Sequence, residues 1–370
     1  MYFKLPKKEL LNPLKMINGV ADQRNAMPIL ANSLVRVENN TIHFIATDNE
    51  VEIACSIPLE AEIGNDANEG STTIPARKLF DICKSLSDDA VVQVNVEENN
   101  ATIKAGKSRF KLQTLPSEEF PNSPELTEPT ELLISQRQLK HFFSKTSFCI
   151  ATNDVRYFLN GLLLEIGDGK MSFAGTDGHR MAVSQHDFTS EQTARVIIPR
   201  KAILELAKLL TDSEDNIKIT MDENHIRFKL NDSLAITSKL IDGDFPDWQG
   251  IIPPNPDKIV MVEAAALKQS LIRVSILSNE KFKGVRLVLS PNLLTIDARN
   301  TYQEEAEETL EVEYDGEEME IGFNGTYLVD AVNAVSGKMV KMSLVDANSS
   351  AVIVDDDDAS DRFIVMPMRL

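Results

Sequence analysis

The sequence TIPARKLFDIC at residues 73–83 reveals how the chain is organised, because two later segments repeat its plan. These segments are IIPRKAILELA at residues 197–207 and IGFNGTYLVDA at residues 321–331. The matched positions, 124 and 125 residues apart, are Pro75, Pro199 and Asn324. A fixed period of self-similarity indicates a chain assembled from repeated structural units.

Two further sets of segments recur in the same order. Strand-like runs precede the first set at residues 42–48 (IHFIATD), 171–177 (MSFAGTD) and 293–297 (LLTID). Helical patterns occupy residues 7–20, 135–150 and 263–278. Prolines are concentrated in residues 115–131 and 241–258, as extended connections between domains require. We therefore predict three repeated domains over residues 1–125, 126–250 and 251–370.

Each repeat has the pattern of an α+β domain with two helices packed on antiparallel sheets. Leu10, Leu14 and Ile17 lie on one face of the first predicted helix. Pro75 and Pro199 are expected in the first turn of their helices, where a missing N–H does little harm. Alternating runs separated by turn residues, as in residues 34–44, predict hairpins. One half-domain unit, a helix with a small sheet, is expected six times.

The composition indicates a globular interior and excludes several classes of protein. Apolar residues make up 42% of the 370 residues, yet no uncharged apolar run approaches the about 18 residues of a membrane span. The N-terminus lacks the layout of a signal peptide. Cys55, Cys83 and Cys149 are far apart, which argues against disulfides and thiolate metal sites and suits a reducing compartment. We expect a cytoplasmic protein without a membrane partner.

The charges are unevenly distributed in this acidic chain, whose formal net charge is −19. The six predicted helices carry 15 basic and 5 acidic residues, whereas the remainder carries 23 and 52. The bias is clear in the first four helices, slight in the fifth and absent in the sixth. Either the helices present ordinary solvated lysines and arginines, or one helical surface faces a polyanion. Few aromatic residues accompany the helices, so phosphate contact without sequence readout is the favoured form of the second explanation.

Several segments together resemble one family, the bacterial sliding clamp, which is the beta subunit of DNA polymerase III. They are TDGHR at 176–180, DVRYFLNG at 154–161, LSNEKF at 277–282, GVRL at 284–287 and VMPMRL at 365–370. The resemblance runs essentially end to end. It implies that the three domains form half of a closed homodimeric ring, with helices facing duplex DNA. It also implies no catalysis, no cofactor and no metal, with the replicative polymerase and the clamp loader as partners.

The same resemblance implies two binding sites. The residues expected to contact the DNA backbone are Arg24, Arg77, Arg156 and Tyr157. An apolar pocket for partner peptides is expected between the second and third domains, lined by Leu159, Thr176, Gly178, His179, Arg180, Met181, Pro246, Ile251, Ser350, Ile364, Val365, Met366, Pro367, Met368 and Arg369. Phe158 replaces a second tyrosine of some relatives. Asp244 and Gly250 stand where relatives often have arginine, which predicts a less basic pocket rim.

The resemblance also implies a dimer interface between edge strands of the first and third domains. Lys107, Arg109 and Lys111 alternate along one strand face, and Phe110 and Leu112 lie on the other. The residues implied on the third domain are Ile276, Leu277, Glu304, Glu307 and Glu308. The alternative for residues 107–111 is an ordinary edge strand that its charge keeps soluble.

Other functions remain as competing hypotheses. Asp177 and His179 suggest a hydrolase, although no nucleophile or third partner is evident beside them. A repetitive acidic scaffold that never meets DNA is also open. The segment AGKS at residues 105–108 lacks the first glycine and the following helix of a phosphate loop. The histidines and cysteines show no zinc spacing, and residues 355–358 are expected to form a solvated acidic loop.

Overall fold

The computed structural model describes residues 1–21, 26–59, 67–254 and 256–369. It contains two compact units. Unit 1 comprises Met1–Gln138 and Leu204–Leu240, and unit 2 comprises Leu139–Ile203 and Ile241–Leu370. The central sequence repeat is thus divided between the two units. Among the described residues, no helix is both long and apolar enough to cross a membrane.

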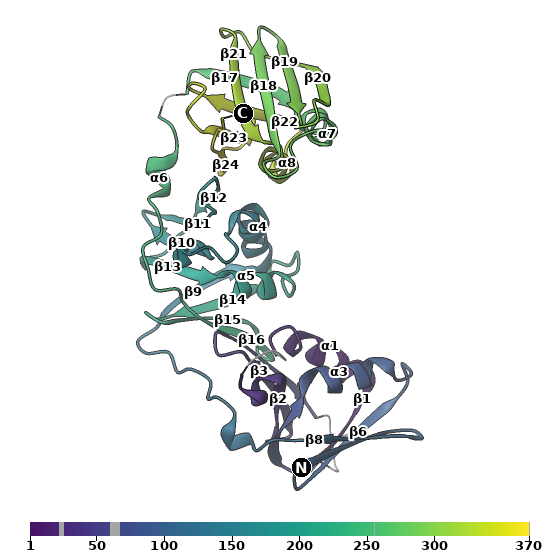
Figure 1. Ribbon diagram of the computed structural model, residues 1–370. Coiled ribbons are helices and arrows are strands. Elements are labelled where there is room, and N and C mark those ends of the chain that lie inside the picture. The colour runs from purple at the N-terminus through teal and green to yellow at the C-terminus, as the bar shows by residue number, and fades with distance from the viewer. Residues whose placement is uncertain (22–25, 60–66, 255, 370) are drawn as a thin grey trace. The chain divides into compact units, whose positions relative to one another are not determined.

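Unit 1 contains two antiparallel sheets (Figure 1). The smaller has the order β1 (Tyr2–Pro6), β6 (Val91–Glu97), β7 (Asn100–Ala105), β8 (Ser108–Gln113). The larger has the order β5 (Gly70–Pro75), β2 (Asn32–Glu38), β3 (Thr41–Thr47), β4 (Val51–Pro58), β16 (Leu234–Lys239), β15 (His225–Asn231), β14 (Asn216–Met221), β9 (Thr130–Ser135). Pairing of β4 with β16 makes this eight-stranded sheet continuous from the first sequence repeat into the second.

Unit 2 has the same plan. Its eight-stranded sheet has the order β13 (Ala194–Pro199), β10 (Gly161–Gly167), β11 (Lys170–Thr176), β12 (Arg180–Asp187), β24 (Asp361–Val365), β23 (Ala351–Asp355), β22 (Met339–Leu344), β17 (Lys258–Glu263). Its four-stranded sheet has the order β20 (Glu305–Glu311), β19 (Leu293–Arg299), β18 (Gly284–Ser290), β21 (Met319–Asn324). The β12–β24 pair joins the second sequence repeat to the third.

All six predicted helices are present, although each is shorter than predicted. They are α1 (Lys7–Ile17), α3 (Ala76–Ser85), α4 (Gln136–Thr146), α5 (Arg200–Ala207), α7 (Ala264–Ser275) and α8 (Gly325–Ala334). A short helix, α6 (Trp248–Ile251), was not predicted. Pro75 and Pro199 directly precede their helices instead of occupying the first turn, so the prediction was wrong by one residue.

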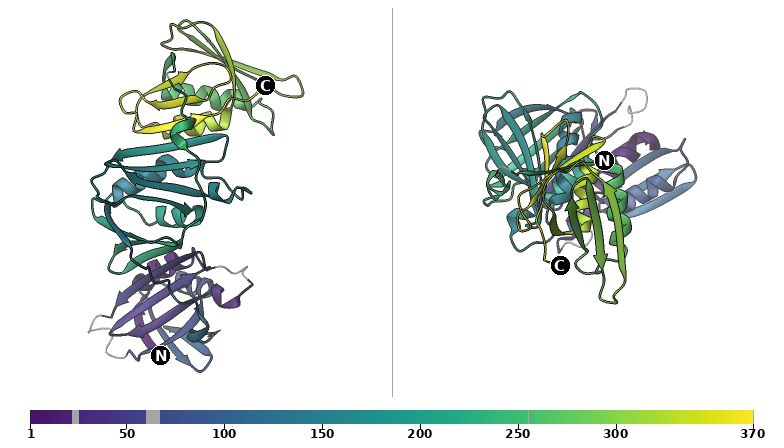
Figure 2. Two further views of the ribbon diagram at one scale, coloured as in Figure 1. Left: turned by 90° about the vertical axis from the view of Figure 1, so that its left-hand side faces the viewer. Right: turned by 90° about the horizontal axis from the view of Figure 1, so that it is seen from above.

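Helix pairs pack on the sheets through apolar stripes. The helices α1 and α3 lie side by side in unit 1, and α7 lies beside α8 in unit 2 (Figure 2). On α7, Leu267, Leu271 and Val274 recur at helical spacing and are fully buried against β18 and β19. Each such side chain stabilises the fold by about 1.5–3 kcal/mol relative to its exposed state.

Asparagine and glycine set the register of the hairpins. Asn39 and Asn40 have φ values of 47° and 56° between β2 and β3, where Glu38 pairs with Thr41. Asp168 and Gly169 repeat this geometry between β10 and β11, with φ values of 52° and 72°. Such two-residue turns follow the twist of the strands, and they hold the buried face of each hairpin toward the core.

The edge strand β20 is anchored to α7 by one carboxylate. Glu308 accepts hydrogen bonds from Ser270 Oγ at 2.7 Å and from Arg273 Nη2 at 2.6 Å. The Arg273 guanidinium lowers the pKa of Glu308 from 4.5 to about 2. A carboxyl group whose pKa is lowered by folding stabilises the fold above its unfolded pKa, and that stabilisation is lost as the pH falls.

We therefore expect Glu308→Gln to lower the thermal midpoint of unit 2 at pH 6, and to lower it much less near pH 3. The reason is that the wild-type carboxylate loses its advantage between its unfolded pKa of about 4.3 and its folded value. Calorimetry at both pH values measures the difference. Glu311→Gln, on the exposed face of the same strand, is the matched control. Equal losses at the two pH values would contradict the assignment.

Candidate functional site

The β12–β24 ladder brings together the two halves of the predicted peptide pocket. Arg180 pairs with Val365 and Met181 pairs with Ile364 in antiparallel register. Beyond the last pair, the Met366 N–H donates to the His179 carbonyl oxygen at 3.0 Å. Main-chain hydrogen bonds thus hold residues from distant parts of the sequence on one surface of unit 2.

The TDGHR motif is a tight turn that leads into β12. Gly178 has a φ of +87°, and a Cβ there would lie 2.7 Å from a guanidinium nitrogen of Arg156. The Asp177 carboxylate accepts hydrogen bonds from the backbone N–H groups of His179 and Arg180, at 2.9 and 3.1 Å. Asp177 therefore has a structural role in the turn. His179 is left exposed at the end of the ladder.

Arg180 is committed to the interior of unit 2. Its guanidinium donates to Asp177 at 3.0 Å, to Asp330 at 2.6 Å and to the Phe148 carbonyl oxygen at 2.9 Å. It also lies 4.4 Å from the centroid of the Tyr327 ring. Because Asp330 and Tyr327 belong to α8, Arg180 fastens the turn before β12 to the third sequence repeat. Its hydrogen-bonding capacity is largely used by these partners.

The predicted pocket has a buried floor and a more accessible rim. Met181 and Ile364 pack in one apolar cluster with Phe245 and Trp248, and half-buried Ile251 packs against it. The buried members of the predicted set are Leu159, Thr176, Met181, Ile364 and Val365. The exposed or half-buried members are Gly178, His179, Arg180, Pro246, Ile251, Ser350, Met366, Pro367, Met368 and Arg369. We call these fifteen residues the peptide surface.

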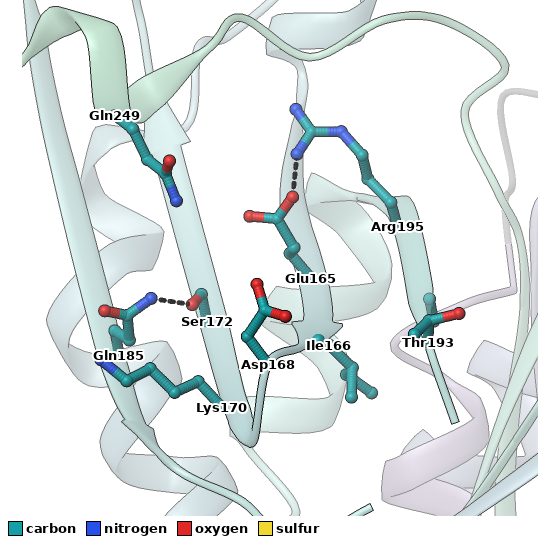
Figure 3. A pocket seen from close by; sticks show the side chains of 11 residues that line it. Glu165, Ile166, Asp168, Lys170, Ser172, Gln185, Thr193, Arg195 and Gln249 are labelled. Carbon is teal, nitrogen blue, oxygen red and sulfur yellow. Dashed lines mark hydrogen bonds and ion pairs between the residues drawn. The ribbon is translucent and has the colours of Figure 1, made fainter. Parts of the chain in front are cut away.

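The short helix α6 carries Ile251 of the peptide surface and is held by a polar anchor that the sequence did not reveal. Trp248 Nε1 donates to Glu165 Oε2 at 2.9 Å. Glu165 forms an ion pair with Arg195, which also donates to the Phe245 carbonyl oxygen at 3.2 Å. Figure 3 shows the Glu165–Arg195 pair in a polar cavity of about 540 Å³. The single tryptophan of the chain was the one available sequence signal.

Two of the residues predicted to contact DNA are engaged in exposed ion pairs. Arg156 Nη2 lies 3.0 Å from Asp154 Oδ2, and Arg77 Nε lies 2.9 Å from Asp81 Oδ2. Hydrogen bonds from Arg156 lower the pKa of Asp154 to about 2. Tyr157 is exposed beside Arg156. Arg24 lies outside the described residues. A phosphate that meets Arg77 or Arg156 therefore competes with a carboxylate already in place.

Two helix lysines are buried and stabilise helix ends. Lys7 Nζ donates to the Leu86 carbonyl oxygen at 2.5 Å, just beyond α3. Lys145 Nζ donates to the Ala334 carbonyl oxygen at 2.5 Å, at the end of α8. A lysine ammonium group there donates hydrogen bonds to carbonyl oxygens that have no partner within the helix. Its positive charge is also favourable at the negative, C-terminal end of the helix dipole. These two charges are therefore not available to a polyanion, although the observed helices remain net positive.

The predicted dimer residues lie on two edge strands, directly before them, or just beyond the end of α7. The strand β8 ends the β1–β8 sheet, with Arg109 and Lys111 exposed and Phe110 and Leu112 half-buried. The strand β20 ends the β18–β21 sheet, with Glu307 exposed. Lys107 is exposed in the turn before β8, Glu304 is exposed before β20, Ile276 is 75% exposed and Leu277 is half-buried. Glu308 points the other way from Glu307 and is bonded to Ser270 and Arg273 of α7.

The described residues also contain one group of side chains suited to a metal ion. His141, His186 and Asp361 lie together at the end of the β12–β24 ladder that is opposite to the peptide surface.

Three family models match nearly the whole chain. They describe the N-terminal domain of the DNA polymerase III beta subunit over residues 1–124, its central domain over residues 133–247, and its C-terminal domain over residues 249–369.

Full-length relatives and solved structures agree with these matches. The beta sliding clamps of Pseudomonas aeruginosa and Escherichia coli are 43% and 41% identical, over 100% of both chains. The crystal structure of the Pseudomonas aeruginosa beta subunit superposes with a TM-score of 0.95, and Caulobacter crescentus pol III beta with 0.93 at 32% identity, each over 100% of both chains. Repeated α+β modules with sheets continued across the repeats define a sliding clamp. The chain belongs to the DNA polymerase III beta subunit family.

The anchor of α6 leads to a prediction for the peptide surface. Trp248→Phe removes the donor to Glu165, and a hydrogen bond to a charged group contributes about 1.5–3 kcal/mol. We expect amide hydrogen exchange in residues 246–252 to accelerate at least about tenfold. Mass spectrometry measures this, with Gln249→Ala, an exposed neighbour, as the control. Unchanged exchange in Trp248→Phe would show that the hydrogen bond does not hold the helix.

Proposed function

We propose that two copies of this sliding clamp close a ring around duplex DNA and hold a polymerase through the peptide surface. The observation that carries the proposal is the similarity to known clamps over the full length of both chains. The ring needs no catalysis, because threading on DNA is itself the function. We propose the cytoplasm as its location, in keeping with three cysteines that the structure leaves as free thiols.

Ring closure is supported by the chemistry of the two edge strands. Among the described residues, neither β8 nor β20 has a hydrogen-bonded strand on its outer side. Exposed edges pair readily with other strands, and a closed dimer removes that hazard. The basic face of β8 and the outward Glu307 of β20 carry opposite charges, which favours a head-to-tail pairing.

DNA binding without sequence preference is supported by the observed helices. The helices α1, α3, α4, α5, α7 and α8 together hold four acidic residues and thirteen basic ones, of which eleven remain when the buried Lys7 and Lys145 are left out. Their excess is provided by lysine and arginine with few aromatic neighbours, which suits phosphates better than bases. An exterior rich in Asp and Glu repels DNA from other surfaces.

Partner binding is supported by the composition of the peptide surface. Met366 is 46% exposed beside the buried floor of Met181 and Ile364. Methionine side chains adapt to different partners because they are flexible and polarizable. The proposed partners are short apolar peptide segments of the polymerase and of the clamp loader. The exposed acid Asp244, and Gly250 without a side chain, make this rim less basic than in many relatives.

The contacts of Asp177 in the turn before β12 argue against the hydrolase alternative, which required Asp177 and His179 to act together. Asp177 uses its carboxylate for two backbone N–H groups and for Arg180, so it is not poised to orient His179. We therefore propose that His179 contacts a partner peptide and has no role as a general base.

Topological retention tests the ring directly. Clamp loaded onto nicked circular DNA by a clamp loader is expected to stay bound through gel filtration and to leave once the DNA is cut. Ile276→Asp places a charge on a 75% exposed side chain at the proposed dimer interface, and it is expected to raise the dimer dissociation constant at least about tenfold. Leu133→Asp, at a 60% exposed side chain on β9, is the control. Equal retention on circular and linear DNA would refute the ring.

The Asp154–Arg156 pair yields a graded prediction for DNA affinity. Asp154→Asn keeps an oxygen for the Arg156 backbone N–H but releases the guanidinium, so affinity for a short duplex is expected to rise about two- to fivefold. Arg156→Ala is expected to lower it and to reduce the salt slope by about one. Fluorescence anisotropy at several salt concentrations measures both.

The matched control for this series is Asp232→Asn. It releases Lys229 from an exposed ion pair of 2.7 Å on a strand hairpin that is not proposed to face DNA. If Asp154→Asn and Asp232→Asn changed affinity equally, Arg156 would have no particular role in DNA binding.

A further inference from the structure

Two imidazoles and one carboxylate converge where α4, β12 and β24 meet. His141 Nε2 lies 3.0 Å from Asp361 Oδ2, and His186 Nε2 lies 3.6 Å from Asp361 Oδ1. One ligand atom from each of the three residues lies within 4.8 Å of the others. The residues come from separate segments of the chain, so no spacing in the sequence announces the cluster.

We propose that His141, His186 and Asp361 form a binding site for a divalent transition-metal ion, with Zn²⁺ as its best fit. Imidazole nitrogen and carboxylate oxygen are common ligands of this ion. Zn–N and Zn–O distances of about 2.0–2.2 Å at tetrahedral angles place neighbouring ligand atoms about 3.3 Å apart. The observed 3.0 and 3.6 Å lie on either side of that value but run to different oxygens of Asp361, so the side chains would shift to share one ion.

His186 provides an independent reason to expect a ligand. Its Nε2 atom is buried and has no hydrogen-bond partner among the described residues. Its nearest acceptor is Asp361 Oδ1 at 3.6 Å, a separation that allows only a long, weak interaction. A buried polar atom without a close partner destabilises the fold, and coordination of a metal ion would remove that cost. The two other histidine–carboxylate pairs, His43–Glu38 and His225–Asp222, each offer a single imidazole at 3.8 and 3.9 Å.

The charges around the cluster favour a cation. Asp187 and Asp358 add their negative potential to that of Asp361. Lys145 opposes a cation, because its Nζ lies 3.7 Å from Asp361 Oδ2. That ammonium group is held by the Ala334 carbonyl oxygen and by Ser336 Oγ at 2.6 Å, and it is outnumbered by the carboxylates.

The two imidazole rings are partly exposed, and the carboxylate between them is already oriented. The His141 and His186 side chains are 36% and 27% exposed, but the His186 Nε2 atom is buried, so this ring would have to turn to admit an ion and a water molecule as the fourth ligand. Ser184 Oγ donates to Asp361 Oδ1 at 2.5 Å, which fixes the carboxylate between the two rings. Partners that orient a ligand in this way strengthen metal binding.

Metal binding would cross-link the second and third sequence repeats. Asp361 pairs with Ser184 on the last rung of the β12–β24 ladder, whereas Arg180 and Val365 at the other end belong to the peptide surface. An ion held by α4, β12 and β24 would therefore resist opening of the ladder that brings the peptide surface together.

Zinc titration of the full-length chain tests the site. Untagged protein is freed of metal with a chelator, dialysed and titrated with Zn²⁺ in a calorimeter. We expect one ion per chain, and an affinity at least tenfold weaker in His141→Gln and in His186→Gln. His43→Gln, at a histidine beside a single carboxylate, is the matched control and is expected to bind as the wild type does.

Two further measurements separate loss of the site from loss of the fold. Zn²⁺ is expected to raise the thermal midpoint of the wild type but not of His141→Gln, whereas Mg²⁺ should change neither. His141 is more than one-third exposed, so its variant is expected to fold even if the His186 variant does not. Absence of Zn²⁺ binding, or binding that both histidine variants retain in full, would overturn the proposal.

Discussion

Pairing of main chains across the repeat boundaries is the constraint on which this structure depends. A four-stranded half-domain leaves an unpaired edge, and its N–H and C=O groups must find partners or remain in water. The β4–β16 and β12–β24 ladders satisfy these groups by joining one repeat to the next. The β12–β24 ladder also brings the two halves of the peptide surface together. Without this ladder, Met181 and Ile364 would not lie side by side in the floor of the predicted pocket.

Arg180 reinforces this ladder from the side. Its guanidinium bonds to Asp177, to Asp330 and to the Phe148 carbonyl oxygen, and it stacks on Tyr327. A half-buried charge is tolerated only when its donors are paired, and here the pairing spans two sequence repeats. The TDGHR segment therefore connects two sequence repeats as well as contributing to the proposed peptide surface. Its glycine and aspartate stabilise the turn, and its arginine holds the turn against α8.

Much of the fold followed from local patterns in the sequence. Helical periodicity located six helices, and asparagine or glycine turns located the hairpins, because both signals arise from neighbours in the chain. The shared eight-stranded sheets were not predicted, since pairing of Ile53 with Ile236 depends on residues far apart in sequence. The same reason hid the Glu165–Arg195–Trp248 anchor and the His141–His186–Asp361 cluster. The members of the predicted binding sites came from family resemblance, and their roles stay predictions.

Not every basic residue of the helices, and not every arginine predicted to contact DNA, has a positive charge that is free for phosphate. Lys7 and Lys145 are basic helix residues, yet each is buried against the end of another helix. Arg77 and Arg156 are exposed, yet each already has a carboxylate within 3.0 Å. A phosphate gains little when it displaces such a partner, because an exposed ion pair contributes only about 0.2–1 kcal/mol. If Arg77 and Arg156 contact DNA as proposed, weak and exchangeable contacts of this kind would suit a ring that moves along DNA, since tightly held phosphates would arrest it. Arginines that are paired with carboxylates bind phosphate more weakly than unpaired arginines do. Paired arginines are therefore better suited to a clamp that slides along DNA.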